Sequence, residues 1–184
     1  MKLKNQILYS ILFMLFFKYS HALEVTLTQG TVKPTPIAIT DLYSSNNSNL
    51  KIGKNISAVI SDNLERSGLF LPINKQAFIQ STESLSKQPR FEDWKVIKAQ
   101  HLVSGKINKV NNNISVEFRL FDVFQQKQII GKKYQTTESN WRRVAHIISD
   151  AIFQSITGEG GYFDTRIVYV AETGPKDNKQ KRLA

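Results

Sequence analysis

The sequence predicts an α/β (α+β) domain of two layers, with two main helices on one face of a mixed sheet of about five strands. Two observations lead to this fold class. Apolar residues recur at spacings of three and four over 56–67 and 141–157, which is typical of amphipathic helices packed on a core. Between them, 101–136 alternates apolar and polar residues across short polar turns, which is typical of an antiparallel meander. Helices packed on one sheet face give a common two-layer architecture.

Composition limits the class of protein further. The 184 residues have room for one ordinary domain with extensions, and the hydrophobic fraction of 41% suits a packed core. The chain contains no cysteine, which excludes disulfides, thiol catalysis, cysteine metal sites and a lipid-modified N-terminal cysteine. Much of the net charge of +10 lies in residues 1–22 and 176–182. The smaller charge that remains suits a solvated surface better than a nucleic-acid-binding one.

The N-terminus has the layout of a secretory signal peptide over residues 1–22. Lysines open it, Ile7 to Phe17 is almost wholly apolar, and Ser20 to Ala22 places small residues where a signal peptidase reads. The apolar run is too short to span a bilayer as a stable anchor. We therefore expect cleavage between Ala22 and Leu23 and an exported protein without a membrane anchor; the alternative is an uncleaved N-terminal anchor.

The next segment, 23–35, is expected to be extended. Leu23, Val25 and Leu27 would lie on one face of a strand, because polar residues alternate with them. Prolines at the end of the segment keep it extended but hinder regular pairing. Such a segment can dock on its own domain or on the edge strand of a partner. The alternative is an ordinary first edge strand.

The domain proper, 36–158, should open with a buried strand at Pro36–Ile39 and a polar loop at 44–49. In the first helix, Asn55 can cap the start and Gly68 ends the helix. The apolar stripe of this helix consists of Ile56, Val59, Ile60 and Leu64. A strand should follow at 69–73, then a loop with about one helical turn at 76–88 and a short helix around Phe91, Trp94 and Ile97. Three further strands are expected at 101–107, 114–120 and 128–136, separated by turns at 111–113 and 125–127.

The last helix should have Ser139 or Asn140 as its cap and Gly158 as its end. After a glycine pair, Arg166–Ala171 is β-branched and aromatic, which favours a strand. We expect this strand to have nothing to pair with in the chain, because Gly174-Pro175 ends it and only a basic tail follows. It would therefore open a second domain.

Sequence motifs predict no catalytic, metal-binding or cofactor-binding site. His21 leaves with the signal, and His101 and His146 have no metal-ligand spacing to carboxylates, so we interpret both as surface or hydrogen-bonded structural histidines. Glu92-Asp93 suits favourable charge near a helix start. There is no phosphate loop and no nucleophile elbow. Three aromatic residues could stack nucleic-acid bases, but their neighbours alternate as in a core strand. They are Phe118, Phe121 and Phe124.

Several stretches occur in an order that indicates a known family. They are Pro36–Ile39, Ile60–Phe70, Ala99–Ile107, Trp141–Asp150 followed by Ile156–Gly158, and Tyr162–Val170. Together they resemble the N-terminal part of the TolB family, and the match in the last helix is the strongest. The final stretch is similar to the family's entry into its β-propeller. Residues 159–184 would then be a linker and the first strand of a propeller that this sequence does not contain.

The resemblance implies a non-enzymatic adaptor of the periplasmic Tol–Pal system, which supports outer-membrane integrity and invagination during cell division. It also implies that the mature N-terminus binds TolA, through Leu23, Glu24, Val25, Thr26, Leu27 and Thr28. In the family, Pal and, in some bacteria, colicins bind the propeller, so we expect that surface to be absent from this chain. The alternative is a small basic α/β nucleic-acid-binding domain.

Overall fold

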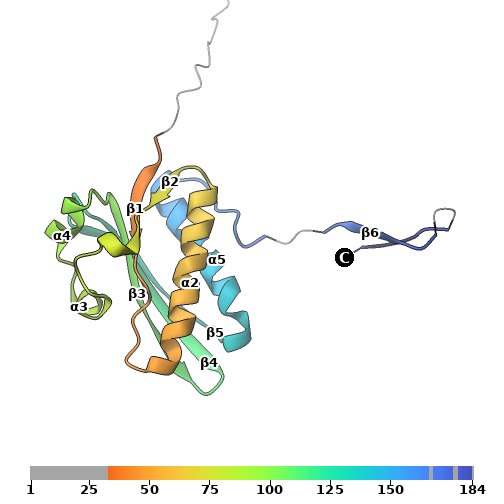
Figure 1. Cartoon of the computed structure of the whole chain (residues 1–184), viewed down its shortest axis with the longest axis horizontal. Coiled ribbons are helices and arrows are strands. Elements are labelled where there is room, and N and C mark those ends of the chain that lie inside the picture. The colour runs from red at the N-terminus through yellow and green to blue at the C-terminus, as the bar shows by residue number, and fades with distance from the viewer. Residues whose placement is uncertain (1–32, 166–167, 176–177, 184) are drawn as a thin grey trace, which may run out of the picture. The chain divides into compact units, whose positions relative to one another are not determined.

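Strands of one mixed sheet form the centre of the computed structural model, which describes residues 33–165, 168–175 and 178–183 (Figure 1). The order across this five-stranded sheet is β2-β1-β3-β4-β5. β1 runs parallel to both β2 and β3, whereas β3, β4 and β5 form the predicted antiparallel meander. The strands are β1 (Thr35–Ile39), β2 (Phe70–Pro72), β3 (His101–Val110), β4 (Asn113–Asp122) and β5 (Lys127–Thr137).

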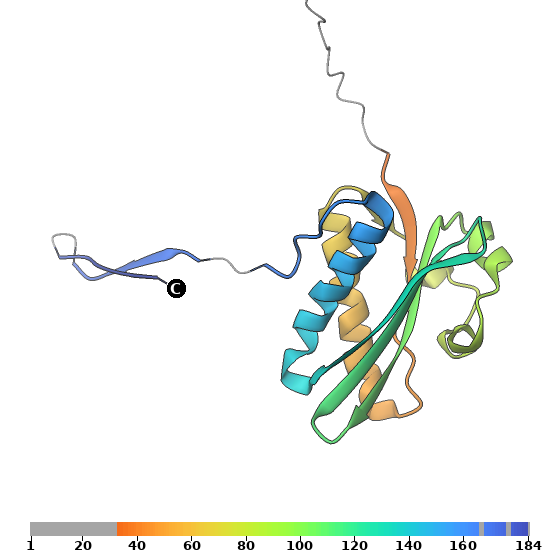
Figure 2. The same cartoon turned by 180° about the vertical axis from the view of Figure 1, so that it is seen from behind.

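Two long helices cover one face of the sheet, as predicted. α2 (Asn47–Arg66) and α5 (Trp141–Thr157) lie side by side in both views (Figures 1 and 2). Each helix buries an apolar stripe against the inward-facing residues of β1, β3 and β4. The members of this core from the helices include Ile52, Ile56, Ile60, Leu64, Val144, Ala145, Ile148 and Ile152.

The other face of the sheet is partly covered as well, which adds to the predicted two layers. The short helices α3 (Thr82–Lys87) and α4 (Phe91–Val96) pack there around Trp94, whose indole Nε1 donates to Gln80 Oε1 at 3.1 Å. Successive residues of a strand point to opposite faces, so β1 contributes to both cores. This second core consists of Ala38, Leu85, Trp94, Ala99, Leu102, Phe121 and Val123.

The starts of both long helices differ from the prediction. α2 begins at Asn47, so the predicted cap Asn55 lies inside the helix. The earlier start brings Gly53 against the Leu42 backbone and places Ile52 one turn further along the apolar stripe. At α5, the side chains of Ser139 and Asn140 bond to Thr137 rather than capping the helix. The predicted stop at Gly158 is confirmed, with a left-handed φ of 80°.

The C-terminal strand was predicted to be unpaired, and this is wrong. β6 (Val170–Thr173) pairs antiparallel with β7 (Gln180–Leu183), so the basic tail forms the second strand of a hairpin. Glu172 forms ion pairs with Lys179 and Lys181, which explains why a basic sequence can return beside β6. The predicted start of the strand at 166–167 lies outside the described residues, as do the signal peptide and residues 23–32.

We expect Gly105→Ala to destabilise the domain. A Cβ at this position of β3 would lie 2.2 Å from the carbonyl oxygen of Glu117 and 2.8 Å from Leu42 Cδ2. Overpacking of this kind costs about 1–3 kcal/mol in free energy of unfolding, measured by urea denaturation. Asn108→Ala, at an exposed position on the same strand, is the control and should change that free energy by less than about 0.5 kcal/mol. Equal stability of the two variants would contradict the packing described.

Candidate partner-binding site

The predicted TolA-binding residues, Leu23 to Thr28, and the predicted cleavage point lie outside the described residues. What the structure describes is the point at which this segment joins the domain. Lys33 and Pro34 lead directly into β1, whose first backbone N–H, at Thr35, donates to the Leu69 carbonyl at 2.8 Å. Because β1 pairs with β2 on one side and β3 on the other, the segment is tethered to a strand that is bonded along both edges.

The edge strands of the described sheet are poor templates for an added strand. β2 has only three residues and ends at Pro72, which has no N–H to donate. On β5, Ile129 is an extra residue between the pairs of Ile130 and Gln128, so the edge carries a bulge. β5 also presents exposed lysines. Short strands, proline, bulges and lysines all discourage pairing at a sheet edge.

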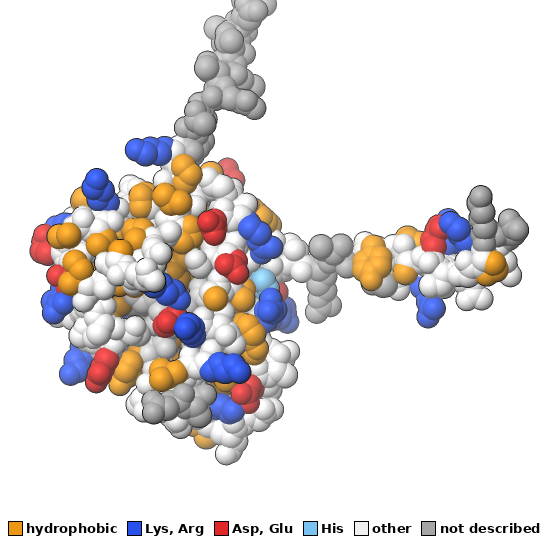
Figure 3. All heavy atoms as spheres, viewed as in Figure 1, with side chains coloured by type: hydrophobic (Ala, Val, Ile, Leu, Met, Phe, Trp, Pro, Cys, Tyr) orange, Lys and Arg blue, Asp and Glu red, His pale blue; other side chains and the backbone are white. Residues whose placement is uncertain are grey.

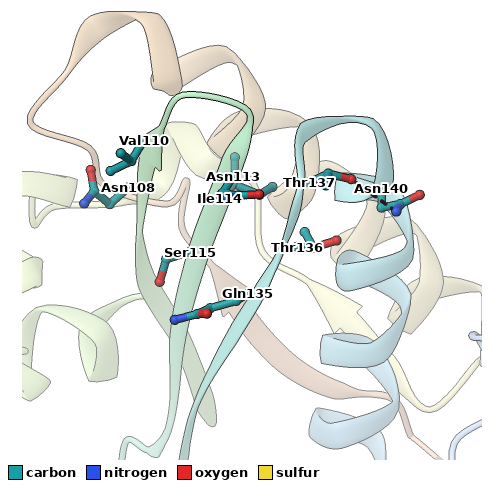
Figure 4. Close-up of a pocket in the computed structure, with 9 residues that line it drawn as sticks. All are labelled: Asn108, Val110, Asn113, Ile114, Ser115, Gln135, Thr136, Thr137 and Asn140. Carbon is teal, nitrogen blue, oxygen red and sulfur yellow. Dashed lines mark hydrogen bonds between the residues drawn. The ribbon is translucent and has the colours of Figure 1, made fainter.

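A groove of about 540 Å³ lies near the β3–β4 turn, mainly on the sheet face opposite α2 and α5 (Figure 4). Short side chains on β4, such as Ser115, lie between the longer Asn108 of β3 and Gln135 of β5, which makes this part of the face concave. The lining side chains are all uncharged: Asn108, Val110, Asn113, Ile114, Ser115, Gln135, Thr136, Thr137 and Asn140. The groove therefore offers hydrogen bonds but no titratable group for acid–base chemistry.

Charged groups begin one row further along the same face. Glu117 on β4 forms ion pairs with Lys106 on β3 and Lys133 on β5, each at 3.4 Å. Burial by itself would raise the pKa of Glu117, but attraction to Lys106 and hydrogen bonds from both lysines outweigh it and hold the pKa below its ordinary value. This carboxylate thus neutralises part of the positive charge on this face.

His146 is a hydrogen-bonded structural histidine, as the sequence predicted, whereas His101 is buried and its Nδ1 has no hydrogen-bond partner among the described residues. His146 Nδ1 on α5 lies 2.9 Å from Asn63 Nδ2 on α2, and the same amide nitrogen donates to Ser149 Oγ at 3.0 Å. Within α2, Arg66 donates to the Asn63 oxygen at 2.6 Å. The contacts of the Asn63 nitrogen with His146 and Ser149 join α2 to α5. His101 is buried at the start of β3, and this burial lowers its pKa despite the opposing effect of Asp122.

No group of three or more His, Asp or Glu side chains in the described ranges is arranged to hold a metal ion. Glu92 and Asp93 occupy the first turn of α4, as predicted, and pair with Lys95 at 2.8 Å and Arg90 at 2.6 Å. These acids are therefore part of the local helix structure.

The aromatic residues considered for base stacking are mostly core residues. Phe118 and Phe121 are buried in the two cores, and Phe124 is 60% exposed. Figure 3 shows Lys and Arg side chains interspersed with Asp and Glu on the face of the domain that it presents. Phe118 and Phe121 are therefore not available for base stacking, and the face shown in Figure 3 carries charges of both signs.

A helix with the length and apolar character needed to cross a membrane is also lacking among the described residues.

Comparison with known proteins identifies similar domains. The family model described as the TolB amino-terminal domain matches residues 23–129. The crystal structure of TolB from Acinetobacter baumannii is 27% identical with a TM-score of 0.63, and the match covers 75% of this chain and 32% of that chain. The chain thus spans only 32% of the length of that TolB.

Two further structures are less similar. The LpoB C-terminal domain from Salmonella enterica is 14% identical with a TM-score of 0.39, covering 60% of this chain and 87% of that chain. The PelC dodecamer from Paraburkholderia phytofirmans is 14% identical with a TM-score of 0.41, covering 66% of this chain and 85% of that chain.

We expect Glu117→Gln to lower stability only where Glu117 is ionised. Because its folded-state pKa lies below the ordinary 4.5, its contribution is present above that pH and is lost as the pH falls through the folded-state pKa. The side chain is 38% exposed, so we expect a loss of less than about 1 kcal/mol. Urea denaturation should find a larger loss near about pH 7 than near about pH 3. A loss that is the same at both values would contradict the ion-pair interpretation.

Proposed function

Because the chain belongs to the TolB amino-terminal domain family, we propose that it is a non-enzymatic periplasmic adaptor that binds TolA through its mature N-terminus. The observation that carries this proposal is the extent of the family match, which starts at Leu23. That residue is also where the sequence predicts the mature chain to begin. The matched region therefore includes the whole proposed TolA-binding segment, 23–28, together with most of the folded domain.

The way in which the segment is attached supports a binding role. Its alternating pattern suits an extended strand with one apolar face, formed by Leu23, Val25 and Leu27. A partner that recognises extended backbone would find poor templates at β2 and β5, so we assign recognition to the segment. The segment is attached to β1, which is hydrogen-bonded to β2 and β3, so tension between the partner and the domain would act on a strand with a partner on each side.

The surroundings of the charged and aromatic residues favour protein binding over nucleic-acid binding. Glu117 neutralises lysines at the centre of the meander, and two of the three candidate stacking residues are in the cores. A single-stranded nucleic-acid site combines a basic groove with exposed aromatic side chains. The groove near the β3–β4 turn has neither, since its lining side chains are uncharged and non-aromatic.

In the cell, the proposed adaptor belongs to the Tol–Pal system and supports outer-membrane integrity and invagination during division. Export by the predicted signal peptide, with cleavage between Ala22 and Leu23, would deliver it to the periplasm. Contacts with Pal or colicins belong to the propeller of longer family members, so we assign them to no residue of this chain.

We expect replacement of residues 23–28 by a Gly-Ser sequence of equal length to abolish binding to the TolA of the same organism. The replacement removes the alternating apolar side chains and makes an extended strand less favourable, while the length of the tether stays the same. Isothermal titration calorimetry with the mature replacement chain should detect no binding, at concentrations that would still reveal an affinity about tenfold, or about 1.4 kcal/mol, weaker than that of the unmodified chain.

The matched control is Asn108→Ala, which changes the groove near the β3–β4 turn and should bind TolA as the unmodified chain does. Circular dichroism should be the same for all three proteins. TolA binding that survives the Gly-Ser replacement would exclude the proposed site. RNA affinity that falls steeply with salt, together with no TolA binding, would favour the nucleic-acid alternative instead.

A further inference from the structure

The segment that follows α5 turns back against this helix. After the left-handed Gly158, the chain reaches Asp150 again at residues 163 and 164. The two oxygens of the Asp150 carboxylate each accept one backbone hydrogen bond, from Phe163 N at 2.7 Å and from Asp164 N at 3.0 Å. Hydrogen bonds to an ionised acceptor are stronger than those between neutral groups, so this carboxylate holds two consecutive peptide units.

Aromatic contacts hold the same segment from a second direction. The Phe153 ring on α5 lies edge-on to both Tyr162 and Phe163, with ring centroids 5.5 and 5.8 Å apart. On its other side, Phe153 contacts Phe70 of β2, with centroids 6.2 Å apart. Phe163 is itself partly buried against the helix-side core. The segment is therefore attached to the core through the end of α5.

An ion pair supplies a third contact. Arg143 Nε lies 3.3 Å from both carboxylate oxygens of Asp164. Arg143, Asp150 and Phe153 are separated by seven and three residues, which places them on one side of an α-helix. One face of α5 thus presents a cation, an anion and an aromatic ring to a short stretch of the same chain.

The close approach of the chain to Asp150 explains why a glycine precedes Tyr162 and Phe163. A Cβ on Gly161 would lie 2.3 Å from Asp150 Oδ1 and 2.5 Å from Asp150 Cα, which a real side chain cannot occupy without displacing the segment. The neighbouring Gly160 is different, since a Cβ there would have nothing within 4 Å. The close approach to α5 therefore depends on position 161 and not on a glycine pair as such.

From these contacts we propose that this face of α5 is an intramolecular docking site for residues 161–164. Its function is to fix the position and direction of residues 161–164 where the chain leaves α5. The occupant is this chain's own segment. It suits the site by the charge of Asp164, by the N–H groups of Phe163 and Asp164 that donate to Asp150, and by the rings of Tyr162 and Phe163. None of these residues belongs to the proposed TolA-binding segment, 23–28, so variants at 150, 160 and 161 leave that segment's sequence unchanged.

The test compares Gly161→Ala with Gly160→Ala in the complete mature chain. Amide hydrogen exchange is measured by NMR at Phe163 and Asp164, whose N–H groups bond to Asp150. We expect slow exchange in the unmodified chain and at least about tenfold faster exchange in Gly161→Ala, because the added methyl forces the segment off the helix. Gly160→Ala should exchange at the unmodified rate. Asp150→Ala should match Gly161→Ala, and Asp150→Asn, which keeps an acceptor oxygen, should lie between.

Core amides of β4, such as those of Val116 and Leu120, report global unfolding in the same spectra. Their exchange should be equal in the Gly160→Ala and Gly161→Ala variants, which separates release of the segment from loss of the fold. Docking is overturned if the Phe163 and Asp164 amides of the unmodified chain exchange as fast as an unstructured peptide. It is equally overturned if the two glycine variants behave alike at these amides.

Discussion

The central constraint on this domain is that β1 is bonded along both edges and buried on both faces. Its partners are β2 and β3, its Ile37 and Ile39 face the core under α2 and α5, and its Ala38 faces the core around Trp94. β2, β3 and the two cores are therefore positioned directly by these five residues. The long helices α2 and α5 pack on the face of β1 that carries Ile37 and Ile39. The short helices α3 and α4 pack on the face that carries Ala38, and the preceding segment joins β1 at Thr35.

The pairing of β1 limits where another strand could be added to the described sheet. Because β1 lies between β2 and β3, a further strand could pair with β1 only by displacing one of them. The described outer strands discourage pairing by shortness, proline, a bulge and lysines. Lys33 and Pro34 join the start of β1, which has a hydrogen-bonded partner strand on each side.

The polar groups within the domain are used for alignment more than for chemistry. Asn63 joins α2 to His146 and Ser149 of α5, and Gln80 joins the loop before α3 to Trp94. A buried amide of this kind accepts only a narrow set of partner positions, because leaving it unpaired is costly. These bonds therefore fix how the helices sit against each other. The same logic applies to Asp150, which lies on α5 but fixes the segment that leaves it.

Local sequence by itself determined the α/β class, the meander, the core stripe of both long helices and the stop at Gly158, because period and turn chemistry are properties of neighbouring residues. Resemblance of short motifs was sufficient to indicate the family. Tertiary structure alone decided the earlier start of α2, where Gly53 packs on the distant Leu42, and the partner of β6, which a basic tail did not suggest. It also decided the roles of Asp150 and Gly161, because contacts between a helix and a segment more than ten residues away leave no periodic signal in the chain.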